Sequence, residues 1–174
     1  MRCELDDIRL LILDVDGVMT DGGIGYASSL EGEIKFFNVH DGTGIAMLRR
    51  AGIKVAWLTG RQSKANRQRA EELHIDLLKE GCRSKGEGVA EIAAHFDVPL
   101  SQCAYIGDDL IDLPAMALVG LPVAVGDAMA EVKEAALWQL ELGGGKGAVR
   151  EFVNRLLKAQ GLYEKALQHY RGEQ

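Results

Sequence analysis

The sequence LLILDVDGVMT, residues 10–20, indicates how this chain folds. Four apolar residues, Leu10–Leu13, lead directly into Asp14 and Asp16, and Gly17 follows them. A short continuous apolar run is typical of a strand that is buried on both faces of a parallel sheet. Because such sheets bind ligands beyond the carboxyl ends of their strands, we expect the two carboxylates at the mouth of the sheet.

Two neighbouring carboxylates raise each other's pKa unless a positive charge lies between them. A hard cation such as Mg²⁺ removes this repulsion and prefers oxygen ligands. Asp and Gly are also common in turns, so an isolated D-x-D-G motif fits an acidic turn at a strand end equally well. The motifs at the other strand ends must decide between the two interpretations.

The composition is that of a globular, soluble protein of one domain. The chain has 174 residues, of which 47% are hydrophobic, and 20 basic against 26 acidic residues leave a net charge of −6. An acidic balance argues against nucleic acid or an anionic membrane as the main partner. No apolar run approaches the roughly 18 residues that span a bilayer.

The cysteines and the N-terminal sequence indicate a reducing compartment. Three cysteines, Cys3, Cys82 and Cys103, are far apart and form no CxxC pair, so neither a disulfide framework nor a zinc site is predicted. The first ten residues, MRCELDDIRL, carry acids where a signal peptide has basic and then apolar residues. We therefore predict a cytoplasmic protein.

Further strands and helices alternate along the chain, which predicts an α/β fold with a doubly wound, Rossmann-like parallel sheet. The later strands are expected at Lys54–Leu58, Ile75–Leu78, Cys103–Ile106 and Leu121–Val125. The helices are expected at Thr43–Ala51, Ser63–Leu73 and Lys85–Phe96, then up to Leu118, up to about Ala136, and at Ala148–Gln160. We predict a single domain over residues 1–160, with Gly143–Gly147 as a flexible loop and residues 161–174 as a polar, mobile tail.

Residues 22–37 predict a β-hairpin inserted between the first strand and its helix. Ile24 and Tyr26 alternate with small residues, and Ile34 and Phe36 alternate with charged or aromatic ones. A turn signal at residues 28–32 lies between these two runs. An isolated hairpin is only marginally stable in water, so we expect it to pack against another surface, for example that of a neighbouring subunit. No segment is long enough for a separate cap domain, so the site is expected to be capless.

Four motifs with polar side chains recur at the predicted strand ends: DVDGVMTD at residues 14–21, LTGR at 58–61, Lys85, and GDDLID at 107–112. Each motif is weak alone, but in this order on an α/β pattern they resemble the haloacid-dehalogenase superfamily of phosphatases. The segments FFNVHDG, GGGKGAVRE and LLKAQG are similar to the family that hydrolyses 3-deoxy-D-manno-octulosonate 8-phosphate (KDO 8-phosphate) in lipopolysaccharide precursor biosynthesis. His40 stands where that family usually has Arg.

The resemblance implies a Mg²⁺-dependent mechanism through an aspartyl-phosphate. Asp14 would be the nucleophile and Asp16 the general acid and base, while Thr59 and Lys85 would stabilise the phosphate. The metal ligands would be Asp14, the backbone carbonyl of Asp16, and Asp108. Behind them, Asp109 and Asp112 would orient Lys85 and metal-bound water. The substrate contacts would be Asp16, Asn38, His40, Asp41, Gly42, Arg61, Arg69 and Lys85. The family also implies a homotetramer with hairpins packed centrally.

Other interpretations remain open for single residues and for the whole chain. Thr59 fits an ordinary strand end, Lys85 a solvated helix start, and Asp108 with Asp109 a helix cap. A phosphatase of a nonulosonate 9-phosphate is an alternative that His40 supports. A receiver-type signalling module is a second, but its phosphorylated Asp would follow the third strand, where this chain has none. A non-catalytic scaffold is a third, which the intact acids argue against.

Overall fold

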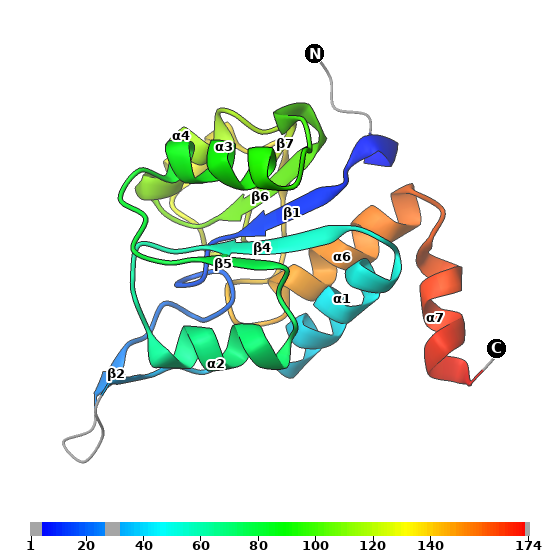
Figure 1. Ribbon diagram of the computed structural model, residues 1–174, viewed down its shortest axis with the longest axis horizontal. Helices are drawn as coiled ribbons and strands as arrows, with labels where there is room; N and C mark the ends of the chain where they lie inside the picture. The colour runs from blue at the N-terminus through cyan, green and yellow to red at the C-terminus, as the bar shows by residue number, and fades with distance from the viewer. Residues whose placement is uncertain (1–4, 27–31, 173–174) are drawn as a thin grey trace.

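The structure, a computed structural model, describes residues 5–26 and 32–172. Its centre is a six-stranded sheet in the order β5-β4-β1-β6-β7-β8, in which all neighbouring strands are parallel (Figure 1). The strands are β1 (Leu10–Leu13), β4 (Lys54–Leu58), β5 (Leu77–Lys79), β6 (Cys103–Gly107), β7 (Leu121–Ala124) and β8 (Trp138–Gln139). Numbered within the sheet, this is the Rossmann order 3-2-1-4-5-6. The predicted doubly wound sheet is confirmed.

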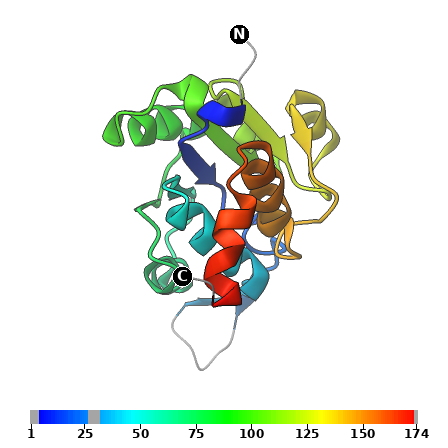
Figure 2. The ribbon, with the colours of Figure 1, turned by 90° about the vertical axis from the view of Figure 1, so that its right-hand side faces the viewer.

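Helices cover both faces of the sheet, with α3 and α4 on one side and α1 and α6 on the other (Figures 1 and 2). The helices are α1 (Val39–Arg50), α2 (Lys64–Glu72), α3 (Lys85–His95), α4 (Leu113–Met116), α5 (Ala130–Ala135), α6 (Ala148–Ala159) and α7 (Tyr163–Arg171). Helices on both faces explain why all four residues of β1 are fully buried. Within the described parts of the chain, no helix is both long and apolar enough to cross a bilayer.

The strand register brings the ends of three strands together. Leu13 pairs with Trp57 of β4 on one side and with Ile106 of β6 on the other. The strand order reverses between β1 and β6, and a Rossmann sheet opens its ligand crevice at such a switch point. The backbone N–H of Asp14 still donates to the carbonyl of Ile106 at 3.1 Å, so Asp14 is held at this point.

The predicted hairpin is present as β2 (Gly25–Tyr26) and β3 (Glu33–Ile34), which pair antiparallel and project from the body of the molecule (Figure 1). Its predicted turn, at residues 28–32, lies outside the described residues except for Gly32. Among the described residues no separate domain covers the sheet edge, in agreement with a capless fold.

The structure corrects the predicted start of α1. The helix begins at Val39, not at Thr43, because the Asn38 side chain caps it by accepting a hydrogen bond from the His40 N–H at 2.8 Å. Asn is among the best N-cap residues. A Cβ on Gly42 would come within 2.9 Å of Arg69 and Leu73, and one on Gly44 within 3.2 Å of Arg150, so glycine suits the close packing around this turn.

The glycine-rich segment Gly143–Gly147 is packed rather than flexible. A Cβ on Gly144 would lie 1.8 Å from the carbonyl oxygen of Gly17, and the N–H of Gly145 donates to the carbonyl of Val18 at 3.0 Å. Glycine is needed here because two backbone segments touch. The segment therefore braces the turn that follows β1.

The predicted mobile tail is mostly a helix, α7, and that expectation was wrong for Tyr163–Arg171. Ala166 is buried, and the guanidinium of Arg50 on α1 donates to the Tyr170 hydroxyl at 2.8 Å and lies over its ring. No pattern in the sequence predicts β8, because this strand has only two residues and is defined by its pairing with β7.

Candidate active site

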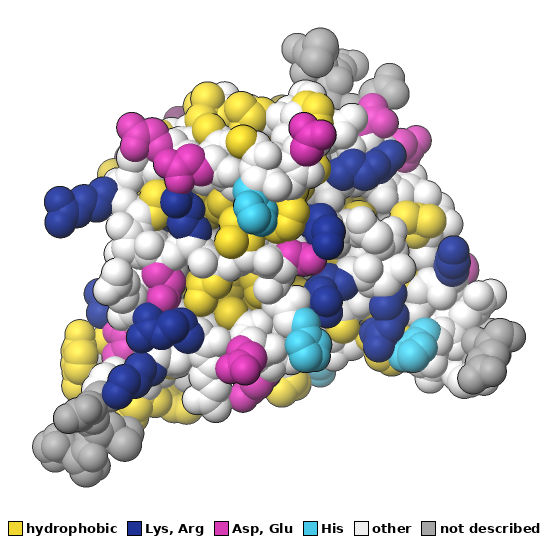
Figure 3. Space-filling model, in the orientation of Figure 1, with side chains coloured by type: hydrophobic (Ala, Val, Ile, Leu, Met, Phe, Trp, Pro, Cys, Tyr) yellow, Lys and Arg dark blue, Asp and Glu magenta, His cyan; other side chains and the backbone are white. Residues whose placement is uncertain are grey.

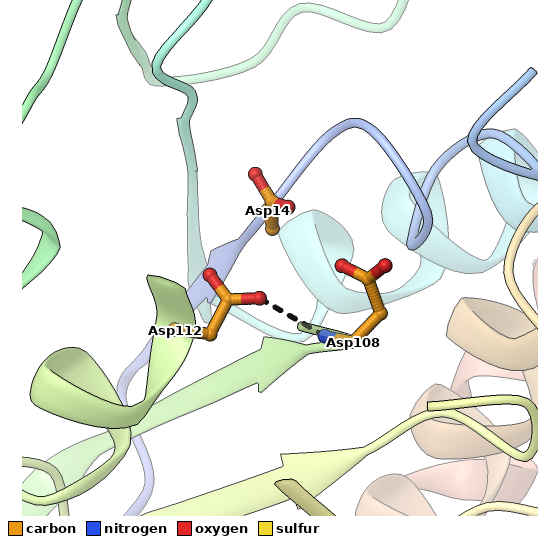
Figure 4. A group of neighbouring side chains, drawn as sticks. All are labelled: Asp14, Asp108 and Asp112. Carbon is orange, nitrogen blue, oxygen red and sulfur yellow. Dashed lines mark hydrogen bonds between the residues drawn. The ribbon is translucent and has the colours of Figure 1, made fainter. Parts of the chain in front are cut away.

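Three carboxylates converge at the switch point of the sheet (Figure 4). Asp14 follows β1, Asp108 follows β6, and Asp112 ends the short 3-10 helix Leu110–Asp112. One carboxylate oxygen from each lies within 4.8 Å of the other two. The predicted edge-of-sheet cluster is thus present, and Asp112 joins it.

Lys85, the first residue of α3, supplies the positive charge inside this cluster. Its ammonium donates to Asp14 Oδ1 at 2.6 Å and to the carbonyl of Leu58 at 2.8 Å, and it lies 3.3 Å from Asp112 Oδ1. The side chains of Lys85, Asp14 and Asp112 are all at least 96% buried. A lysine so deeply buried requires such partners, so its interpretation as a solvated helix start is wrong.

Asp112 is fixed by hydrogen bonds to both of its oxygens. Oδ1 accepts from the Tyr105 hydroxyl at 2.5 Å, and Oδ2 accepts from the backbone N–H groups of Asp108 and Asp109 at 3.0 and 3.3 Å. Its carboxylate therefore lies against Lys85 and holds the turn after β6, and its predicted role toward metal-bound water stays a prediction. Asp109 is exposed and accepts from the Leu110 N–H, so it caps this turn instead of orienting Lys85.

The residues at the cluster fit a hard divalent cation. Asp108 Oδ1 is buried and, among the described residues, has no hydrogen-bond partner. A Cβ on Gly17 would lie 2.0 Å from Asp108 Oδ2, so only glycine lets this carboxylate approach the turn after β1. Several carboxylate oxygens around a small space are the ligands that Mg²⁺ takes.

Burial and mutual repulsion raise the pKa values of two of these acids. Burial raises the pKa of Asp14, and the charge of Asp112 adds to this, so that the pKa reaches about 6 despite the opposing charge of Lys85. Burial and the charges of Asp14, Asp112 and Asp109 raise the pKa of Asp108 to about 8. A cation bound between them favours the ionised forms.

These pKa values predict that Mg²⁺ stabilises the protein more at pH 8 than at pH 5. Without metal, raised carboxyl pKa values contribute stability that is present below the unfolded-state pKa and is lost as the pH rises through about 6 and about 8. Mg²⁺ stabilises the ionised acids and should offset that loss. The test is thermal unfolding with chelator and with Mg²⁺ at both pH values; a Mg²⁺-dependent rise in Tm that is equal at the two would contradict the prediction.

Asp16 lies in a second charged group that joins the turn after β1 to the hairpin and to β4. Its Oδ1 accepts a hydrogen bond from Lys35 at 2.5 Å, Lys35 lies 3.2 Å from Glu33, and Glu33 pairs with Arg61 at 2.6 Å. Thr59, 1% exposed, accepts from the Arg61 N–H at 3.1 Å. Arg61 therefore lies beside Thr59 at the end of β4, and its guanidinium is paired with Glu33.

The residues at the start of α1 have different surroundings. Asn38 donates from its amide to the Gly145 carbonyl at 3.3 Å, and exposed His40 lines an open cavity of about 450 Å³ with Lys146, Arg150 and Asn154. Asp41 is fully buried and accepts from the Arg150 N–H at 2.8 Å. Asp41 thus caps α6 instead of contacting substrate as expected.

Gly42 and Arg69 lie against each other between α1 and α2. A Cβ on Gly42 would come within 2.9 Å of the Arg69 guanidinium, which pairs with Glu72 on its own helix at 3.1 Å. This contact involves helix surfaces and none of the three carboxylates. The role of Arg69 in substrate binding stays a prediction.

Lys35 and Tyr105 belong to the charged groups at the site but were not predicted from the sequence. Lys35 stands among alternating residues of the hairpin, where a lysine usually faces water, and its partner Asp16 is 19 positions away. Tyr105 occupies an inward position of β6, where an aromatic residue is ordinary core. No local signal distinguishes either residue, because their roles depend on partners far along the chain.

Comparison with known proteins connects this site to a family. Residues 62–143 match the model for haloacid dehalogenase-like hydrolases. The KDO 8-phosphate phosphatase of Haemophilus influenzae is 45% identical over 161 residues, which are 92% of this chain and 89% of that protein. Its cobalt-bound structure has a TM-score of 0.88 at 44% identity and covers 92% of this chain and 93% of that one. A Moraxella catarrhalis KDO 8-phosphate phosphatase with magnesium, phosphate and KDO has a TM-score of 0.92 at 35% identity, covering 96% and 95%.

In this chain, acids from two strand ends and a buried lysine meet at the switch point of a sheet in the Rossmann order. This arrangement is typical of the haloacid dehalogenase-like hydrolases, and the family match agrees with it. Within that superfamily, the similarity extends over nearly the whole length of both proteins. The chain belongs to the family of KDO 8-phosphate phosphatases.

Proposed function

We propose that this protein hydrolyses KDO 8-phosphate to KDO and inorganic phosphate, in the cytoplasm, during synthesis of lipopolysaccharide precursors. The observation that carries the phosphatase reaction is the position of Asp14, which is held at the end of β1 with the Lys85 ammonium 2.6 Å from its carboxylate. The 45% identity to a KDO 8-phosphate phosphatase supports the choice of substrate. A carboxylate that is buried beside a fixed positive charge suits attack on an anionic phosphate.

Asp14 attacks phosphorus in line with the leaving sugar oxygen and becomes an aspartyl-phosphate. Asp16, two residues on and still partly exposed, gives a proton to that oxygen and later takes one from the attacking water. Thr59 and Lys85 stabilise the charge on the phosphate oxygens. Water then releases phosphate and restores the Asp14 carboxylate.

The Asp14 carboxylate, the backbone carbonyl of Asp16 and the Asp108 carboxylate would hold Mg²⁺. Asp108 has an unpartnered buried oxygen, which supports this assignment. When bound, the cation screens the repulsion between the anionic nucleophile and the anionic phosphate. Asp112 keeps Lys85 and the turn after β6 in place.

A second candidate substrate is a nonulosonate 9-phosphate, which is also an acidic sugar phosphate. His40 favours it, because an exposed imidazole beside Lys146 and Arg150 replaces the arginine usual in the family. The test is phosphate release from a panel of sugar phosphates with Mg²⁺. We expect the highest kcat/KM for KDO 8-phosphate; a higher value for the nonulosonate ester would transfer the assignment to it.

Asp16→Asn should lower kcat by about 10²–10⁴-fold for the sugar phosphate, the usual contribution of general acid–base catalysis. The loss should be smaller for nitrophenyl phosphate, because nitrophenolate leaves without a proton. Steady-state rates with both substrates decide this. Equal losses with the two substrates would contradict the role of the Asp16 side chain as general acid.

The hairpin is proposed as the assembly element of a homotetramer. Tyr26 and Phe36 are 76% and 77% exposed in the single subunit, and Val39, the first residue of α1, is 71% exposed. Figure 3 shows hydrophobic side chains gathered at the corner where the hairpin leaves the body. Such a patch marks an interaction surface, and a capless site needs a neighbour to exclude water.

Tyr26→Asp with Phe36→Asp should give smaller species, since a charge buried at an interface without a partner is costly. Light scattering coupled to size exclusion measures the result. Leu137→Asp, at a position 65% exposed near β8, is the matched control and should leave the assembly intact. A monomeric wild-type protein would contradict the proposed assembly.

A further inference from the structure

Lys35 is a buried lysine that the mechanism above does not use. It follows β3 of the hairpin, and its side chain has no exposed surface. Its ammonium lies 2.5 Å from Asp16 Oδ1 and 3.2 Å from Glu33 Oε1. Lys35 therefore contacts the proposed general acid from outside the catalytic motifs of the chain.

The surroundings of Lys35 fix its position. Glu33 binds Lys35 on one side and the Arg61 guanidinium on the other at 2.6 Å. Burial alone would raise the pKa of Glu33, but hydrogen bonds from Arg61 and Ser63 and the charge of Lys35 outweigh it and lower the pKa to about 2. Glu33 is therefore a lasting negative charge that holds Lys35 against Asp16.

The four charges alternate in sign and connect three separate segments. Asp16 lies in the turn after β1, Lys35 and Glu33 belong to the hairpin, and Arg61 lies in the loop after β4. The Asp16 side chain is 21% exposed, so without this contact its carboxylate is free to turn toward water. With it, one carboxylate oxygen has a fixed place.

We propose that Lys35 is a positioning residue for Asp16: it holds Oδ1 as an acceptor, so that Oδ2 carries the proton and faces the leaving sugar oxygen that receives it. This inference rests on the proposed phosphatase function. The hairpin then has a second role besides assembly, because the side chain that orients the general acid belongs to it. Proton transfer is sensitive to placement, and an error of about 1 Å in a reacting group can cost 10²-fold in rate.

The first test compares Lys35→Met with Lys35→Arg and with the control Lys54→Met. Lys54 is 53% exposed and pairs with Asp76 at the other end of β4. Lys35→Met should lower kcat for KDO 8-phosphate by about 10²-fold with little change in KM. The loss for nitrophenyl phosphate should stay below about threefold, because that substrate needs little acid catalysis. Lys35→Arg should recover part of the loss, and Lys54→Met should match wild type.

A double-mutant cycle keeps the inference testable if Lys35→Met does not fold. Asp16→Asn removes the negative partner, so Lys35→Met added to it leaves no unpaired charge at this contact. If Lys35 acts through Asp16, the double variant should be within about threefold of Asp16→Asn alone on the sugar phosphate. A further loss of about 10²-fold would show an independent role and overturn the inference.

The remaining outcomes separate this inference from the proposed function. Equal losses of kcat on both substrates, or a change confined to KM, would overturn the positioning role of Lys35. If the wild-type enzyme is active and Lys35→Met has the same kcat for KDO 8-phosphate, the positioning role is also overturned, but the phosphatase assignment is not affected. A wild-type enzyme that releases no phosphate from KDO 8-phosphate would contradict the proposed function itself.

Discussion

Asp14→Asn is expected to lower kcat for KDO 8-phosphate by about 10⁴-fold or more, which is the order of effect seen when a hydrolase loses its nucleophile. A neutral amide is a poor nucleophile and a poor ligand for Mg²⁺. The fold should survive, because the change is isosteric. Lys85 also keeps Asp112 as its partner, 3.3 Å away.

The measurement is the steady-state rate of phosphate release, together with thermal unfolding of the same preparation. In the presence of chelator, Tm should not fall, because the variant removes one of three mutually repelling acids. Asp7→Asn, at an exposed position of the 3-10 turn Leu5–Asp7, is the control and should keep wild-type activity. Activity above a few per cent in Asp14→Asn would contradict the assignment of the nucleophile.

Lys85→Met should damage both stability and catalysis. The change leaves Asp14 and Asp112 buried without their cation, and removing one partner of a buried ion pair costs about 3–5 kcal/mol in unfolding free energy. For a protein of this size each kcal/mol lowers Tm by roughly 2–4 °C. The kcat should fall by about 10²–10³-fold, as when one preorganised donor to the transition state is lost.

A second variant separates the two effects of Lys85. Lys85→Met combined with Asp112→Asn removes one buried negative charge and should recover much of the lost stability. It should not recover activity, because the charge near the phosphate is still missing. Lys79→Met, at a partly exposed position that pairs with Glu91, is the control. Recovery of activity in the double variant would show that Lys85 is only structural.

The sequence was sufficient to predict the sheet and the residues at its switch point. Leu10–Leu13 form a buried central strand as the apolar run indicated, and Asp14 and Asp108 meet because the ends of parallel strands share one edge. These predictions succeed because they depend on local pattern and on the rules of parallel sheets. The hairpin followed in the same way from alternation and a turn signal.

The features that could not be predicted depend on contacts between distant segments. The two residues of β8 are a strand only through pairing with β7, and α7 is held by its contact with Arg50. Asp41 was expected near substrate but caps α6, a helix that begins more than 100 residues later. Lys35 acquires its partner Asp16 only when the hairpin folds back toward the turn after β1.

The central claim is that Asp14 carries the phosphoryl group during turnover, and one measurement addresses it directly. The enzyme, in excess over KDO 8-phosphate and with Mg²⁺ present, is quenched in acid within the first turnover, digested, and its peptides are mapped by mass spectrometry. We predict a transient acid-stable phosphoryl group on the Asp14 carboxylate, which disappears as inorganic phosphate accumulates and is absent from Asp14→Asn. A phosphoryl group on another residue, or full release of phosphate with none on Asp14 at any time, would contradict the account.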